Sequence, residues 1–250
     1  DNNLAELDVS GLTNLTTLIC SNQGTQPGNP ALNVSLGESP THLSYSGMHT
    51  LDITNCSSLY SCTAGRNMIT NSTFYFGGNC SLASLKMNAN LFTSLPYLAG
   101  SNSASGISLS SSCSIPLHVI RFSGNPITSF VPGATGLMSQ LTDIHLDSCL
   151  IGGIINLSGF PLLTRVFFHD QGEGGIPVAT ANITKVNVAN GNNNVMYWGG
   201  GGLFGGILFT GNAPTTGAIC VQHDVGFVPT VGQNWQNAFP PGTTFSSSPC

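Results

Sequence analysis

Three ionisable side chains alternate along the segment DIHLD, at Asp143, His145 and Asp147. Alternate residues of a β-strand point to one face, so a strand here would present two carboxylates and an imidazole together. Carboxylate oxygens and imidazole nitrogens bind divalent metals, and His169 could supply a fourth ligand from a neighbouring strand. The segment therefore allows either a cation site or a patch of paired charges.

Motifs of catalysis are absent from the sequence, which has no GxSxG, HExxH or P-loop pattern. Glycoside hydrolysis would need two carboxylates across a cleft. Only Asp143 and Asp147 qualify by position, and both fall on one short segment. We therefore expect no enzymatic activity and no cofactor.

Charge is scarce in this chain. Its 250 residues include five basic and ten acidic ones, giving a net charge of −5, so solubility must come from Asn, Ser, Thr and Gly. The lack of a basic block argues against a nucleic-acid partner, because phosphate binding depends on Lys and Arg. No apolar run reaches the roughly 18 residues of a membrane span. This composition favours an extracellular, cell-surface or virion location, and Asp1 is either a processed terminus or a fragment end.

A nine-residue frame recurs along the chain, with apolar residues at positions one, four and six and Asn, Cys or Gln at position nine. The segment LHVIRFSGN at 117–125 fits it best. Copies begin at residues 15, 40, 59, 82, 117, 141, 163, 183 and 204. Seven of the eight steps are 19–25 residues, and the exception brackets a Ser-rich insertion at 91–116. Such a period predicts stacked repeats that each contribute a short strand.

This frame resembles the leucine-rich repeat (LRR), which has the pattern LxxLxLxxN/C-x-L and a period of roughly 20–29 residues. The motifs LDVSGLTNLTTLICSN (7–22) and LDITNCSSL (51–59) are similar to LRR proteins of the bacterial surface and phage-borne type. The resemblance implies a repeat solenoid, an LRR horseshoe of strands and loops with little helix and a short parallel β-sheet on its concave face. We expect an N-terminal cap at 1–14, about nine repeats at 15–212 with the insertion at 91–116, and a C-terminal cap at 213–250.

The ninth position of the frame predicts an internal ladder, because an Asn side chain can satisfy backbone groups in the turn that follows each strand. The ladder residues would be Asn67, Asn90, Asn125 and Asn212, with Cys149 as an alternative and Gln23 and Gln171 as poorer substitutes.

The eight cysteines lack the paired spacing of a zinc site. Those expected to be buried thiols, from their positions in the frame, are Cys20, Cys56, Cys62 and Cys149. The other four could form two disulfides, which would suit an oxidising setting. We predict that Cys80–Cys113 closes the insertion and that Cys220–Cys250 pins the tail.

Positions three, five and seven of the frame point away from the core, onto the expected concave face. These 27 positions hold 6 of the 15 charged residues, including four of the five basic ones. Because Ser, Thr and Asn supply most of the surface, solubility alone does not require charge there, and we predict a binding face with Phe167 as an exposed aromatic contact. Arg121 and Arg165 would neutralise the neighbouring carboxylates, which favours a charge-paired patch over a metal site. The predicted binding residues are Lys86, Arg121, Asp143, His145, Asp147, Arg165, Phe167, His169 and Lys185.

The resemblance to bacterial surface and phage-borne LRR proteins implies adhesion or receptor binding. We expect a non-catalytic extracellular or virion module, such as part of a phage fibre or a surface adhesin, with a protein or glycan receptor on the concave face. The alternative is a structural subunit of a virion or extracellular filament that self-associates through its flat faces. Concave charge substitutions would abolish binding in the first case and leave assembly intact in the second.

Overall fold

The structure is a computed structural model, and it describes residues 4–23, 47–95, 116–130, 139–171, 183–196, 206–209, 212, 219–229 and 235–250. Within these ranges the chain forms short parallel strands and two single-turn 3-10 helices. The helices are η3 (Asn193–Val195) and η4 (Trp235–Asn237).

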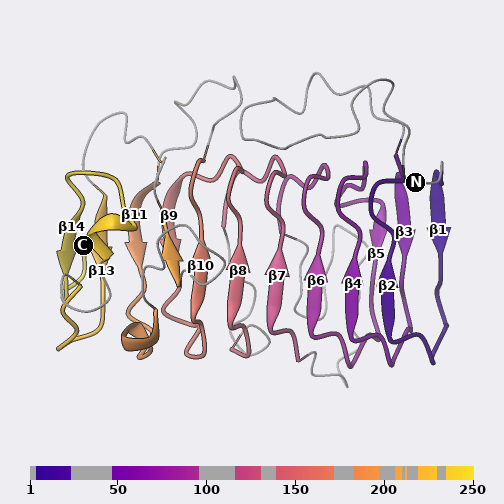
Figure 1. Cartoon of the computed structure of the whole chain (residues 1–250), viewed down its shortest axis with the longest axis horizontal. Coiled ribbons are helices and arrows are strands. Elements are labelled where there is room, and N and C mark those ends of the chain that lie inside the picture. Colours follow the sequence, from indigo (N-terminus) through magenta and orange to yellow (C-terminus); the bar gives the residue numbers. More distant parts are fainter. Residues whose placement is uncertain are drawn as a thin grey trace.

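The largest sheet has seven parallel strands in the order β12-β10-β8-β7-β6-β4-β2. Its strands succeed one another along the long axis of the molecule, and each strand lies roughly across that axis (Figure 1). Their bounds are β2 (Thr17–Ile19), β4 (Ser61–Thr63), β6 (Ser84–Lys86), β7 (Val119–Arg121), β8 (Asp143–His145), β10 (Arg165–Phe167) and β12 (Ile207–Leu208).

Two smaller parallel sheets hold the remaining strands. A three-stranded sheet consists of β1 (Glu6–Asp8), β3 (Thr50–Asp52) and β5 (Phe74–Tyr75). A four-stranded sheet has the order β14-β13-β11-β9. Its strands are β9 (Gly153–Asn156), β11 (Ile183–Asn187), β13 (Cys220–Gln222) and β14 (Thr244–Ser246). The chain alternates between sheets: β8 and β10 belong to the seven-stranded sheet, whereas β9 and β11 belong to the four-stranded one.

The predicted LRR horseshoe with one short parallel sheet is wrong, because the described strands form three separate parallel sheets. The described residues contain little helix, as expected. Segments outside the nine-residue frame also form strands. One of them is LDIT (51–54), which overlaps β3. Leu51 and Ile53 alternate along that segment and are fully buried, which is the period-two pattern of a strand with one face in the core. The copy of the frame at 183–191 also forms a strand outside the seven-stranded sheet, because its strand is β11 of the four-stranded sheet.

Aromatic rings of the core contact one another in separate groups. Phe92 and Phe122 meet edge to face with centroids 5.2 Å apart, and Phe168 and Phe209 stack at 5.4 Å. Phe209 stacks in turn on Phe239, at 4.8 Å. These contacts run between neighbouring strand-and-turn segments, so the apolar core itself extends along the axis of the stack.

The predicted amide ladder is confirmed in the residues that the structure describes. Asn125 Nδ2 donates to the carbonyls of Met87 and Phe122, and its Oδ1 accepts from the backbone N–H groups of Asn90 and Phe92. Equivalent bonds are made by Asn67, Asn90, Gln171 and Asn212, and Cys149 Sγ donates to the Phe122 carbonyl. Gln23 makes no equivalent bond, because its Nε2 donates to the nearby Ser21 carbonyl and its buried Oε1 has no partner among the described residues. The ladder therefore fixes the turns that follow the other strands of the seven-stranded sheet, from β4 to β12.

The residue before each ladder position from 23 to 171 adopts a left-handed backbone conformation. The φ angles there are 57° at Asn22, 57° at Arg66, 51° at Ala89, 70° at Gly124, 54° at Ser148 and 56° at Asp170. The N–H of this residue donates to a carbonyl of the neighbouring segment, as from Ala89 to Ser123 at 2.8 Å. This hydrogen bond holds each turn against the next one. A left-handed residue directs its side chain differently from the strand residues that precede it. Arg66 and Asp170 both occupy this position.

The predicted Cys220–Cys250 disulfide is confirmed, with the two Cα atoms 6.0 Å apart. Cys80 is also disulfide-bonded, but Cys113, its predicted partner, lies outside the described residues. The four cysteines expected to be buried thiols are free and buried, as predicted: Cys20, Cys56, Cys62 and Cys149. Burial raises the pKa of the Cys20 thiol to about 11, so this thiol is unreactive near neutral pH.

Candidate binding face

Four predicted binding residues form one row across the seven-stranded sheet. The pairing register places Lys86 beside Arg121, Arg121 beside His145, and His145 beside Phe167. These residues end β6, β7, β8 and β10, so their side chains leave the same face of the sheet. We call them the Lys86 row.

Asp143 is the centre of a charge cluster next to this row. Its Oδ2 accepts a hydrogen bond of 3.1 Å from Arg165 Nη1 and lies 3.8 Å from Arg121 Nη2. Its Oδ1 lies 2.6 Å from His145 Nε2, although the angles of that contact fall outside hydrogen-bond geometry. The prediction of a charge-paired patch is therefore confirmed for these four residues.

The Asp143 carboxylate is buried within the cluster. The Asp143 side chain is 5% exposed, whereas those of Arg121 and Arg165 are 34% and 47% exposed. Asp143 was expected to point to solvent, and it is instead covered by its own partners. The surface that a ligand would meet is therefore formed by the two guanidinium groups and the imidazole, with the negative charge beneath them.

Two opposing effects act on the pKa of Asp143. Burial is the largest single effect and raises the pKa, because it disfavours the charged form. The close contact with His145 and the positive charges of Arg121 and Arg165 act in the other direction, and together they hold the pKa below its ordinary value. Asp143 is therefore an anion at neutral pH.

Phe167 was expected to be an exposed aromatic contact, but it is half-buried. Its ring stacks on His145 with centroids 4.4 Å apart and an interplanar angle of 27°. His145 thus lies between Asp143 and Phe167, and these contacts limit its side-chain freedom. The aromatic ring closes one end of the Lys86 row.

Asp147 and His169 follow their strands and make contacts of their own. Asp147 Oδ1 accepts a hydrogen bond of 2.7 Å from the Ser123 hydroxyl, and His169 Nε2 lies 3.6 Å from Asp170 Oδ2. Burial raises the pKa of Asp170; Asp147 adds to this effect, and His169 opposes it. Among the residues with described positions, no group of three or more His, Cys, Asp or Glu side chains is arranged to hold a metal ion.

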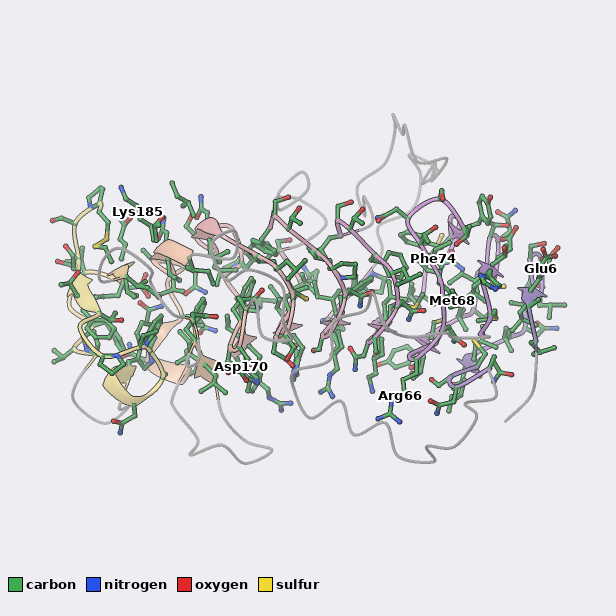
Figure 2. The ribbon with its side chains drawn as sticks, turned by 90° about the horizontal axis from the view of Figure 1, so that it is seen from above. Glu6, Arg66, Met68, Phe74, Asp170 and Lys185 are labelled. Atoms are coloured by element: carbon green, nitrogen blue, oxygen red, sulfur yellow. A yellow bond between two sulfur atoms is a disulfide. The ribbon has the colours of Figure 1, made fainter. Side chains whose placement is uncertain are left out.

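Lys185 does not belong to this face, contrary to the prediction. It lies on β11 of the four-stranded sheet, and its Nζ donates to the Cys250 carbonyl at 2.8 Å. Figure 2 places Lys185 along one long edge of the molecule and both Arg66 and Asp170 along the opposite edge. The frame assigned Lys185 to the wrong sheet because both kinds of strand share the same apolar spacing.

Arg66 and Asp170 were missed by the sequence reasoning, which considered only positions three, five and seven of the frame. Both occupy position eight, next to the ladder residue, and both have positive φ. Arg66 is exposed just after β4, and Asp170 is half-buried just after β10. The recurrence of Asn, Ala, Gly and Ser at this position is the signal that could have indicated a left-handed turn.

Comparisons of the chain with protein-family models, with curated proteins and with solved structures gave no match. No helix in the described ranges is long and apolar enough to cross a membrane. Any inference about function therefore depends on the geometry of the site.

Proposed function

We propose that this chain is a non-catalytic recognition module that binds a glycan or protein ligand on the face formed by the Lys86 row and the Asp143 cluster. The main supporting observation is the position of the basic residues. Three of the five in the chain, Lys86, Arg121 and Arg165, lie on neighbouring strands of one sheet. Arg and aromatic side chains are favoured anchors of binding interfaces.

The fold itself does not require this cluster. The row that contains Asp143 and Arg165 continues across the sheet through Val119, Ser84 and Ser61, which are small or apolar and uncharged. A partly buried ion pair contributes little net stability, because the loss of hydration offsets the attraction between the charges. A ligand-binding role accounts for the placement of these charges better than a stabilising role does.

The Cys220–Cys250 disulfide is compatible with an oxidising environment outside the cell, and we propose an extracellular, cell-surface or virion location. Adhesion to a surface glycan or protein receptor, as in a phage fibre or a surface adhesin, fits such a location.

Self-association as a structural subunit is the second candidate function. It is favoured by apolar exposure near one edge of the seven-stranded sheet. Ile19 on the edge strand β2 is 74% exposed, and Tyr60, which precedes β4, is 59% exposed. Among the described residues β2 is the last strand of the sheet, and an edge strand with exposed apolar side chains can pair with another chain.

One experiment separates the two candidates. Labelled protein is applied to an array of acidic oligosaccharides, neutral oligosaccharides and acidic peptides, and its assembly state is measured by sedimentation velocity. The variant Arg121→Ala/Asp143→Asn/Arg165→Ala removes the cluster without leaving a buried carboxylate unpaired, and Lys185→Ala is the control on the other sheet. We expect array binding by wild type and Lys185→Ala but not by the triple variant. Polymeric protein that binds nothing on the array would favour the structural subunit.

A further inference from the structure

Lys86 and Arg121 stand side by side in register on β6 and β7. Like charges on directly paired residues destabilise a sheet. In a chain with so few basic residues, this pairing is an electrostatic cost, and Asp143 offsets only the Arg121 charge, since Lys86 has no ion pair among the described residues. An anion placed over both side chains would turn the cost into an attraction.

Both side chains also have unused hydrogen-bond donors. Arg121 Nη2 is 3.8 Å from Asp143 Oδ2, which is too far for a hydrogen bond, and the Arg121 side chain is 34% exposed, so a ligand can reach the guanidinium group. Lys86 has no ion-pair or hydrogen-bond partner among the residues whose positions are described. A carboxylate is the group that a guanidinium fork and an ammonium group bind together most readily.

Neutral polar groups surround this pair of cations. Thr63 lies beside Lys86 in the same row, and Ser61 and Ser84 are paired in the adjacent row. These groups match the hydroxyls of a carbohydrate, whereas protein interfaces centre on large aromatic anchors.

We propose that the ligand of this face is a carboxylate-bearing oligosaccharide, with a uronate-type carboxylate bound between Lys86 and Arg121 and its hydroxyls over β4 and β6. This inference rests on the proposed function and specifies its ligand class. Neighbouring strands are about 4.8 Å apart, a spacing comparable with one sugar ring, so successive rings can lie across successive strands. Phe167 and the His145 ring stacked on it bound the row at its far end.

The test is calorimetric titration of the whole chain with three probes of matched length: tetragalacturonate, neutral maltotetraose, and acetylated, amidated tetraglutamate. We expect tetragalacturonate to bind, and its affinity to fall with added salt because the contact is ionic. Lys86→Glu should weaken that binding about tenfold or more, and Lys86→Gln should weaken it less. The matched control Lys185→Glu, a charge reversal on the other sheet, should leave it unchanged. Lys86 has no partner to lose among the described residues, and its substitution removes the repulsion from Arg121, so the two Lys86 variants should unfold at or slightly above the wild-type temperature. Lys185→Glu loses the hydrogen bond to the Cys250 carbonyl, so its own melting curve must show that it is folded before its binding is compared.

Each other outcome contradicts the inference in its own way. Equal binding of maltotetraose would show that the carboxylate is not recognised. Tighter binding of tetraglutamate would assign the face to an acidic peptide. Binding of maltotetraose or of tetraglutamate would still be consistent with the proposed recognition function. Unchanged binding by Lys86→Glu would place the ligand elsewhere. Failure of all three probes would overturn the acidic-glycan assignment, and the proposed function would then be judged by the array.

Discussion

Arg165 on β10 lies directly opposite Asp143 on β8, and its Nη1 donates a hydrogen bond of 3.1 Å to Asp143 Oδ2. Arg121 approaches the same oxygen from β7, on the other side of β8. One buried carboxylate therefore holds two guanidinium groups from two neighbouring strands. This arrangement pre-positions both arginines, so less side-chain freedom is lost when a ligand binds.

Asp143 should make the stability of the protein sensitive to acid. Its pKa is lowered in the folded state, so its contribution is complete above the ordinary carboxyl pKa of about 3.9 and is lost as the pH falls through the folded value. Asp143→Asn should reduce the free energy of unfolding by about 1–2 kcal/mol at neutral pH, because two arginines lose their counter-charge. The difference between variant and wild type should shrink below about pH 4. Urea unfolding from neutral pH down to about pH 3 measures this, and a difference independent of pH would contradict it.

The ladder should be a major source of stability. Asn125 is 1% exposed and takes part in four hydrogen bonds to backbone groups. Asn125→Ala should cost about 3 kcal/mol or more, because several buried donors and acceptors lose their partners. Asn88→Ala is the control, since Asn88 is half-buried and its side-chain oxygen has no partner within the described residues, and it should change stability by less than about 0.5 kcal/mol. Equal costs in chemical denaturation would show that the ladder is not a special source of stability.

The left-handed position before the ladder should discriminate between Gly and Ala. Gly124 has φ 70°, and a Cβ added there would be no closer than 3.7 Å to Ala89, so space is sufficient and only the backbone is strained. Gly124→Ala should therefore cost about 1 kcal/mol. The reverse change, Ala89→Gly at φ 51°, should be neutral or stabilising. Thermal unfolding of the two variants checks the pair, and a loss of stability in Ala89→Gly would contradict the strain argument.

Removal of the Cys220–Cys250 disulfide should lower stability without disturbing the binding face. The bridge spans a sequence separation of 30 residues, so the loop-closure entropy it supplies corresponds to up to about 3–4 kcal/mol. Cys220→Ala/Cys250→Ala should unfold at a lower temperature in differential scanning calorimetry. A melting temperature equal to that of wild type would mean that the bridge is not formed in solution, which mass spectrometry of unreduced peptides would also reveal.

The local features of this protein followed from its sequence more readily than its architecture did. Leu117, Ile120, Phe122 and Asn125 were correctly placed in the core and the ladder, because apolar spacing reports directly on which side chains face inward. The division into three sheets was not foreseen, since strands such as β3 and β11 carry the same apolar spacing as those of the seven-stranded sheet. Strand pairing depends on contacts between residues far apart in the chain, which local spacing does not report.

The candidate site shows the same limit. The Lys86 row and the charges around Asp143 could be predicted, because residues at the same position of successive copies stack across a sheet. Lys185 was misplaced because its copy of the frame pairs in another sheet. The burial of Asp143 and the stacking of His145 on Phe167 depend on side-chain conformations, which residue spacing does not specify.

The most direct test of the binding face is to follow the side-chain Nε–Hε signals of arginine by NMR during titration with tetragalacturonate. The chain has only three arginines, so each signal can be assigned by substituting one residue at a time. We predict that the Arg121 signal shifts progressively to saturation, because the partly exposed guanidinium group of Arg121 lies beside the proposed carboxylate site, and that the Arg165 signal shifts as well. Saturable binding measured by calorimetry, with both of these signals unchanged, would contradict the assignment of the ligand to this face.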